Sequence, residues 1–354
     1  MTENIRMLME EPSAERIQRY YDGMRPFWHP VVRSEDLLEG KPSAAELLGE
    51  PLVLARLNGR LVAMQDLCRH FQARLSQGEI TRVDGNDCLQ CPYHGWTYGE
   101  DGRVVYIPQL GAGRDIPADA KVPVYLTTEK HGLVWVCLHT HPHFDLPDFP
   151  ELEDGSFHSG SLRVYEPWRA SVPRVVMGAL DDTHFPWVHT GLLGDRSAPE
   201  APDHKAWREG DALKVAYTMN QPRNPSTGTH TGQGGFDRIE YLNSVTIPGV
   251  IRLVKTSENG QVYVIWLAAC PNRFNQTKTF WRVVRNYDHD PAHDSDYEAF
   301  EDRVRAQDKV IVEGQRPWLL PPFWEKIELP LRPADIPLIE YQRWLQELGV
   351  VTDI

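Results

Sequence analysis

Short apolar runs separated by turn residues characterise the chain between residues 50 and 138. The clearest runs span 52–55, 61–64, 104–107 and 133–136. Asn58-Gly59 lies between the first two runs and is a strong β-hairpin signal, and Glu100-Asp101-Gly102 marks a second turn. Short strands with turns of this kind are typical of a small all-β domain.

Longer runs of β-branched and aromatic residues occur in the second half of the chain. Segments 241–247, 262–268 and 279–285 are rich in such residues, and together they predict an antiparallel sheet. The stretch 195–235 contains many glycine, proline and asparagine residues, so we expect loops there. These loops are either a segment that covers an active site or an ordinary surface region.

Three segments predict helices. Residues 1–25 indicate a polar helix that lies outside the main cores. Between 295 and 315 apolar residues recur at helical spacings, and a final amphipathic helix is expected between 333 and 348. The apolar positions of these last two helices are Tyr297, Phe300, Val304 and Ile311, and Ile339, Trp344 and Leu345.

The 354 residues exceed the usual size of a single core, so about two domains are expected. The patterns place an N-terminal helical extension at 1–25, a β domain at 26–150 and a second domain at 151–354. The segment 139–143, His-Thr-His-Pro-His, precedes the boundary. It lacks a carboxylate or cysteine at a suitable spacing, so we interpret it as a solvated linker rather than a metal site.

Composition narrows the class of protein. The hydrophobic fraction of 41% and charged fraction of 25% are typical of a globular protein, and the net charge of −13 argues against nucleic acid or an anionic membrane as partner. No run of 18 apolar residues predicts a membrane span, and the first residues do not resemble a signal peptide. We therefore expect a cytoplasmic protein.

The five cysteines do not suggest a disulfide framework. Cys68 and Cys91 belong to a motif described below, and Cys88 has no assigned role. Cys137 and Cys270 lie in apolar runs, so we expect them to be buried small side chains.

Two cysteines and two histidines form the first chemical motif. Cys68-Arg69-His70 and Cys91-Pro92-Tyr93-His94 are separated by 20 residues, and each half supplies one thiolate and one imidazole. Such a set can hold a [2Fe–2S] cluster with the thiolates on one iron and the imidazoles on the other, which raises its reduction potential. A zinc finger usually keeps like ligands together, but a structural zinc loop stays open as the alternative.

A second motif combines imidazoles and carboxylates. His184 follows Asp181 by three residues and His189 follows His184 by five, with Pro186 between the two histidines. On an unbroken helix two residues five apart diverge by about 140°, so we expect Pro186 to break the helix. Asp308 falls on the apolar face of its helix, where an unpaired carboxylate is costly to bury. Two histidines and one carboxylate suit a non-haem Fe(II) site that activates oxygen, whereas packed histidines are the simpler alternative.

Together the motifs resemble the oxygenase component of Rieske non-haem iron oxygenases across nearly the whole chain. The family signature D-x-x-H-x4-H is matched by Asp181, His184 and His189, and its helical aspartate ligand by Asp308. The resemblance implies an α+β protein, with an N-terminal all-β Rieske [2Fe–2S] domain and a C-terminal helix-grip (START-like) catalytic domain with an antiparallel sheet. The family often has an asparagine shortly before the bridging aspartate, where this chain has 177–179, Met-Gly-Ala.

The resemblance also implies a mechanism and partners. Cys68, His70, Cys91 and His94 would hold the cluster, and a mononuclear Fe(II) would activate O2 as co-substrate. Asp181 would link His184 to His94 of a neighbouring subunit in a homotrimer. Electrons would come from NAD(P)H indirectly, through a separate flavin or iron–sulfur reductase, with or without a ferredoxin. The chain has neither a dinucleotide-binding G-x-G-x-x-G after a strand nor a plant-type ferredoxin motif.

The segment 184–191 and the chain length resemble the homotrimeric branch of the family. We therefore favour monooxygenation, that is hydroxylation or O- or N-dealkylation, of a small aromatic or N-heterocyclic compound over cis-dihydroxylation. We expect pocket residues from 175–192, 220–240, 262–268 and 279–285. Alternatives from other classes are a non-catalytic Rieske electron carrier with a ligand-binding domain and a zinc-stabilised binding module.

Overall fold

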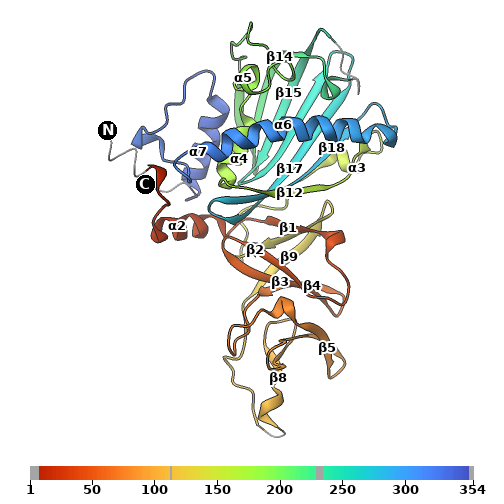
Figure 1. The fold of residues 1–354 in the computed structure, drawn as a ribbon, viewed down its shortest axis with the longest axis vertical. Coiled ribbons are helices and arrows are strands. Elements are labelled where there is room, and N and C mark those ends of the chain that lie inside the picture. The colour runs from red at the N-terminus through yellow and green to blue at the C-terminus, as the bar shows by residue number, and fades with distance from the viewer. Residues whose placement is uncertain (1–7, 112–113, 229–233, 351–354) are drawn as a thin grey trace. The chain divides into compact units, whose positions relative to one another are not determined.

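A computed structural model describes residues 8–111, 114–228 and 234–350 of the chain. The chain divides into two compact units (Figure 1). One unit is Arg25–Phe144. The other combines the chain up to Met24 with the chain from Asp145 onward. The three histidines of segment 139–143 are exposed and lie at the end of the first unit.

The Arg25–Phe144 unit consists of two antiparallel sheets. The larger sheet has the strand order β1-β10-β9-β4-β3-β2, and the smaller has the order β5-β6-β7-β8. The strands of the larger sheet are β1 His29–Arg33, β2 Ser43–Leu47, β3 Glu50–Leu57, β4 Arg60–Gln65, β9 Val124–Lys130 and β10 Leu133–Cys137. Those of the smaller sheet are β5 Glu79–Val83, β6 Asn86–Gln90, β7 Thr97–Tyr98 and β8 Val104–Tyr106.

Tight turns set the register of these hairpins. Asn58 and Gly59 join β3 to β4 with φ of 52° and 74°, and positive φ at both central residues is the geometry that an Asn-Gly hairpin turn requires. The predicted β-hairpin is therefore confirmed. The core of the unit includes both Cys68 and Cys91 among its buried apolar side chains, so the two thiols lie inside the protein.

The second unit is built around an eight-stranded antiparallel sheet. Its order is β11-β18-β17-β16-β15-β14-β13, and β12 pairs separately with β18. The strands are β11 His158–Ser159, β12 Arg163–Trp168, β13 Lys205–Glu209, β14 Ala212–Pro222, β15 Phe236–Thr246, β16 Val250–Ser257, β17 Val262–Arg273 and β18 Gln276–Arg285.

The three predicted strands of this sheet are confirmed as β15, β17 and β18, but the loop prediction for 195–235 is wrong. That stretch contains β13 and β14, and in β14 the buried Leu213, Val215 and Tyr217 alternate with more exposed residues. This alternation has the period of two that a strand shows. Residues 229–233 lie outside the described part of the chain.

Helix α6 (Asp294–Gly314) lies across one face of this sheet (Figure 1). Phe300, Val304 and Val312 are buried, whereas Ile311 is half exposed, so the prediction that Ile311 belongs to the apolar face is wrong. The helix instead continues its inward face from Val304 to Val312 in steps of four residues. The other helices are α2 Ala14–Met24, α3 Pro150–Glu153, α4 Val172–Leu180, α5 Phe185–Val188 and α7 Ile336–Glu347.

The helices at the two ends of the chain both pack into the second unit. In α7, Ile339, Trp344 and Leu345 are buried as predicted. In α2, Tyr20 and Met24 are buried, so the expectation that this helix lies outside the cores is wrong. The many charged residues of α2 made its narrow apolar face difficult to predict from the sequence. The α+β class expected from the sequence is confirmed.

Two general expectations concern the whole chain. All five cysteines are buried, as expected for Cys137 and Cys270. Within the residues that the structure describes, none of the helices has both the length and the apolar character needed to cross a membrane.

Two glycines of the Arg25–Phe144 unit allow a matched stability test. Gly85 and Gly102 both have positive φ, of 82° and 76°. A Cβ on Gly85 would meet nothing within 4 Å, whereas one on Gly102 would collide with the carbonyl oxygen of Val122. We expect Gly85→Ala to cost about 1–2 kcal/mol, the usual penalty of left-handed backbone, and Gly102→Ala to cost clearly more.

The measurement is the urea midpoint of unfolding for wild type and both variants. A midpoint for Gly102→Ala equal to or above that of Gly85→Ala would contradict the steric argument, because the two substitutions share the same backbone penalty.

Candidate functional site

The loops that begin at Cys68 and Cys91 have the same backbone design. In each, the N–H four positions after the cysteine donates to the cysteine carbonyl, and the cysteine N–H donates to the carbonyl five positions on, at 2.8–3.1 Å. The fourth position has positive φ in both, with 59° at Gln72 and 72° at Gly95. Two equivalent turns therefore present the two sulfurs in the core of the β unit.

Tyr98 forms a hydrogen bond with one of these sulfurs. Its hydroxyl accepts from the backbone N–H of Arg69 at 2.9 Å and lies 3.1 Å from Cys68 Sγ, where it can donate its own proton to a thiolate. Burial is the largest cause that raises the pKa of Tyr98 above its ordinary value, and the contact with Cys68 is the second. The hydroxyl therefore stays a donor, and a donor to sulfur stabilises a thiolate.

The two histidines of the motif lie together nearer the surface. The His70 ring is perpendicular to that of His94 at 4.7 Å and stacks on Trp96 at the same distance. His70 Nδ1 is buried without a hydrogen-bond partner, which leaves it available as a ligand. Paired thiols inside and paired imidazoles outside fit a two-iron cluster with unlike ends.

The second motif flanks a single helical turn. Helix α4 ends at Leu180, and α5 contains only Phe185–Val188, with Pro186 in its first turn. The predicted break therefore falls at Asp181 rather than at Pro186. Because His184 precedes the turn and His189 follows it, their rings meet at 5.0 Å.

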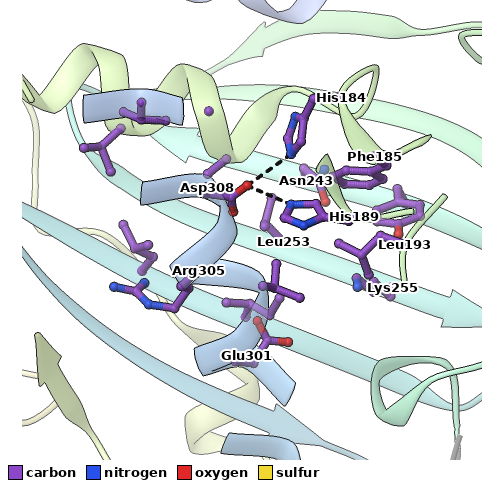
Figure 2. Close-up of a pocket in the computed structure, with 18 of the residues that line it drawn as sticks. His184, Phe185, His189, Leu193, Asn243, Leu253, Lys255, Glu301, Arg305 and Asp308 are labelled. Atoms are coloured by element: carbon purple, nitrogen blue, oxygen red, sulfur yellow. Dashed lines mark ion pairs between the residues drawn. The ribbon is translucent and has the colours of Figure 1, made fainter. Parts of the chain in front are cut away.

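Helix α6 brings a carboxylate to these rings (Figure 2). Asp308 Oδ1 lies 2.7 Å from His189 Nε2 and 3.3 Å from His184 Nε2. One ligand atom from each of the three residues lies within 4.8 Å of the others. The structure thus brings together all three residues predicted to form this site.

Outer hydrogen bonds fix the orientation of both imidazoles. His184 Nδ1 lies 3.0 Å from Asp181, and His189 Nδ1 lies 2.8 Å from Gln307 Oε1. Since both partners are acceptors, the Nδ1 atoms carry protons and the Nε2 lone pairs face Asp308. With both rings neutral, two Nε2 lone pairs and a carboxylate oxygen would converge on one point, which is the arrangement of a metal site.

The charges around His184 support the same conclusion. Burial acts to lower the pKa of His184, but hydrogen bonds to Asp181 and Asp308 outweigh it and raise that pKa to about 9. Burial acts to raise the pKa of Asp308, yet its contacts with His184 and His189 hold it below the ordinary value. The site therefore has a local potential that attracts a cation.

The side chains of His184, His189 and Asp308 line a largely apolar pocket. Four further polar side chains line it: Asn243, Lys255, Glu301 and Arg305. The apolar and aromatic lining includes Trp168, Val175, Phe185, Leu193, Tyr217, Tyr241, Leu253, Ile265, Leu267, Phe300, Val304 and Val312. Residues from 175–192 and 262–268 line the pocket, as predicted from the sequence. Among the described residues, 220–240 and 279–285 contribute none of the lining, because strands β14 to β17 and α6 form those walls.

Sequence reasoning missed several of these residues. Lys255 follows Leu253 by two positions in β16, and both line the pocket, as strand alternation allows. Glu301, Arg305 and Asp308 follow one another by four and three residues on α6, which places them on one helical face. These spacings could have indicated a shared face, but only the fold shows what that face contacts.

Comparisons with known proteins agree with this geometry. The family model of the Rieske [2Fe-2S] domain matches residues 27–126, and that of the vanillate O-demethylase oxygenase C-terminal domain matches residues 168–350. Methylxanthine N1-demethylase NdmA of Pseudomonas putida is 32% identical over 92% of this chain and 89% of its own length.

Two further relatives show the same relationship. The solved structure of Pseudomonas putida NdmB is 28% identical, with a TM-score of 0.78 over 93% of this chain and 92% of its own. Chloroacetanilide N-alkylformylase, oxygenase component, of Rhizorhabdus wittichii is 26% identical over 83% of this chain and 84% of its own length.

A Rieske domain joined to an oxygenase domain defines an iron-dependent oxygenase, an oxidoreductase rather than a passive carrier or a zinc-stabilised module. The chain belongs to the Rieske non-haem iron oxygenases.

Gln307 provides a test of the outer hydrogen bonds. Gln307→Leu removes the acceptor that orients His189, and we expect Fe(II) affinity at the three-donor site to fall by about 10–100-fold. Iron retained during dialysis against increasing chelator measures this, with Arg303→Leu, on the exposed side of α6, as control. Equal iron retention in Gln307→Leu and wild type would show that Gln307 does not support the site.

Proposed function

We propose that the chain is the oxygenase component of a multi-component system that monooxygenates a small aromatic or N-heterocyclic compound, with removal of an N- or O-methyl group as the favoured reaction. The observation that carries this proposal is the convergence of His184, His189 and Asp308 at a largely apolar pocket. The match to a vanillate O-demethylase domain and the similarity to a methylxanthine N-demethylase favour demethylation over cis-dihydroxylation.

Within this proposal, Cys68, His70, Cys91 and His94 hold the Rieske cluster. His184, His189 and Asp308 hold a mononuclear Fe(II), which supplies the means to reduce and activate O2. The unpartnered Nδ1 of His70 and the inward Nε2 atoms of His184 and His189 support this assignment. The surrounding apolar side chains exclude water and position the methyl group.

The overall reaction balances with two electrons and two protons from outside. One oxygen atom enters a methyl C–H bond and the other leaves as water. The resulting hydroxymethyl group breaks from nitrogen or oxygen and departs as formaldehyde. We propose that NAD(P)H supplies the electrons through a separate reductase, with or without a ferredoxin, which agrees with a relative that is named as an oxygenase component.

We further propose that electrons cross between subunits of a homotrimer through Asp181. Phe71 and Tyr93, beside the cluster histidines, are 66% and 63% exposed, and Trp187 in α5 is 55% exposed. Large exposed aromatic side chains at both ends of the proposed route are suited to an interface. Asp181 would join His184 to His94 of the neighbouring copy.

The proposed activity is tested with a surrogate reductase, NADH and a panel of N-methyl and O-methyl ring compounds. We expect one formaldehyde per O2 consumed with the best substrate. Asp308→Ala is expected to abolish formaldehyde release while keeping the Rieske electron paramagnetic resonance signal, because the cluster lies in the other unit. Asp296→Ala, which removes an exposed carboxylate of α6, is the control and should remain active.

Other outcomes would redirect the proposal. A cis-diol product would favour the dihydroxylase alternative. Full formaldehyde release by Asp308→Ala would remove Asp308 from the iron site.

Asp181→Asn tests the bridging role. The amide preserves the shape of Asp181 but lacks its charge and one acceptor oxygen, so both metals should remain while oxidation of the reduced cluster slows by about 10–100-fold in a single turnover. Asp203→Asn, at an exposed position nearby in sequence, serves as control. A wild-type rate in Asp181→Asn would contradict electron transfer through this carboxylate.

A further inference from the structure

Lys255 is a buried cation in the wall of the substrate pocket. It lies in β16, is 4% exposed, and lines the same pocket as the three-donor site (Figure 2). Its direct cross-strand partners are Tyr241 and Tyr263. The Nζ atom lies 5.8 and 5.9 Å from the centres of these two rings, within the range of cation–π attraction.

A rigid network holds the ammonium in place. Nζ donates to Ser226 Oγ at 2.7 Å, and the Ser226 hydroxyl donates in turn to Asn224 Oδ1 at 2.6 Å. The Asn224 amide donates to the carbonyls of Leu192 and Pro222 at 2.9 and 2.8 Å. An ammonium has three donors, and Ser226 uses one, so two remain for the pocket.

Among the residues that the structure describes, no carboxylate lies within ion-pair distance of Lys255 Nζ. Glu301 is the carboxylate that most influences it, but Glu301 accepts from the Tyr263 hydroxyl at 3.0 Å and also faces Arg305. Glu301 is therefore shared between Lys255 and Arg305, whereas Asp302 and Asp308 also act on Arg305.

A buried ammonium without a carboxylate in direct contact is costly in a largely apolar pocket unless a ligand compensates it. Burial lowers the pKa of Lys255 to about 8, so the amine is still mainly protonated at neutral pH. The pocket is therefore prepared for negative charge at this position, on the strand wall formed by β15 and β16.

We propose that Lys255 is a specificity-determining residue that binds an anionic oxygen, a carboxylate or phenolate, on the ring of the substrate. The inference deepens the proposed function and rests on it, because it assigns the substrate class for the same pocket. The aromatic walls hold the ring, Lys255 binds the charged substituent, and the methyl group is left to face His184, His189 and Asp308.

Binding without turnover tests this assignment. Isothermal titration of the full-length, iron-loaded protein compares 4-methoxybenzoate with 4-methoxybenzamide, which have nearly the same shape and differ in charge. We expect the acid to bind at least tenfold more tightly than the amide. Lys255→Met should lose that preference, and Lys205→Met, at an exposed lysine of β13, should keep it.

Equal binding of acid and amide by the wild type, no binding of the acid, or a preference that survives in Lys255→Met would overturn the inference. The wild-type comparison decides the question even if Lys255→Met does not fold. Failure of the proposed demethylation would show separately, as absent formaldehyde with every substrate. Formaldehyde from neutral substrates only would support the proposed function but reject the role of Lys255.

Discussion

The chemistry of the second unit depends on one electrostatic constraint, the convergence of three acceptors at one point. Asp308 Oδ1 faces the Nε2 atoms of His184 and His189 at 3.3 and 2.7 Å. Such an arrangement is unfavourable unless a proton or a metal cation lies between the three atoms. The chain ends α4 at Leu180, makes a single turn and lays α6 across the sheet, and each of these features is needed to bring the three side chains together.

The same principle orders both chemical sites, since a hydrogen bond on the far side of each donor determines what it presents. Asp181 and Gln307 hold the Nδ1 protons of the two histidines, so that Nε2 faces inward. Tyr98 accepts from the backbone of Arg69 and can donate its own proton to the Cys68 sulfur. Metal ligands alone would leave ring orientation and sulfur charge undetermined, and these outer contacts supply both.

Local spacing explains how much could be predicted from the sequence. The motifs at 68–94 and 181–189 are short and chemically unusual, so candidate ligands could be predicted from them, whereas Asp308 is predicted from its position on an apolar helix face. The prediction for Ile311 is wrong because positions three and four residues after Asp308 both fit helical spacing. Only the fold shows that Val312, and not Ile311, faces inward. Lys255 and Gln307 depend on contacts between distant segments, namely the pairing of β16 with its neighbours and the approach of α6 to His189.

The proposed iron ligands and the other side chains that line the pocket come from different parts of the fold. The proposed iron ligands come from the ends of a short turn and from α6, whereas Tyr217, Tyr241 and Lys255 are successive cross-strand partners on the sheet. A strand can exchange one pocket side chain while its backbone pairing is kept, because the ladder hydrogen bonds do not involve side chains. Substitutions among these side chains of the sheet can therefore change which substrate fits without moving His184, His189 or Asp308. That separation gives a physical reason why proteins with one common oxygenase fold can act on compounds as different as methylxanthines and chloroacetanilides.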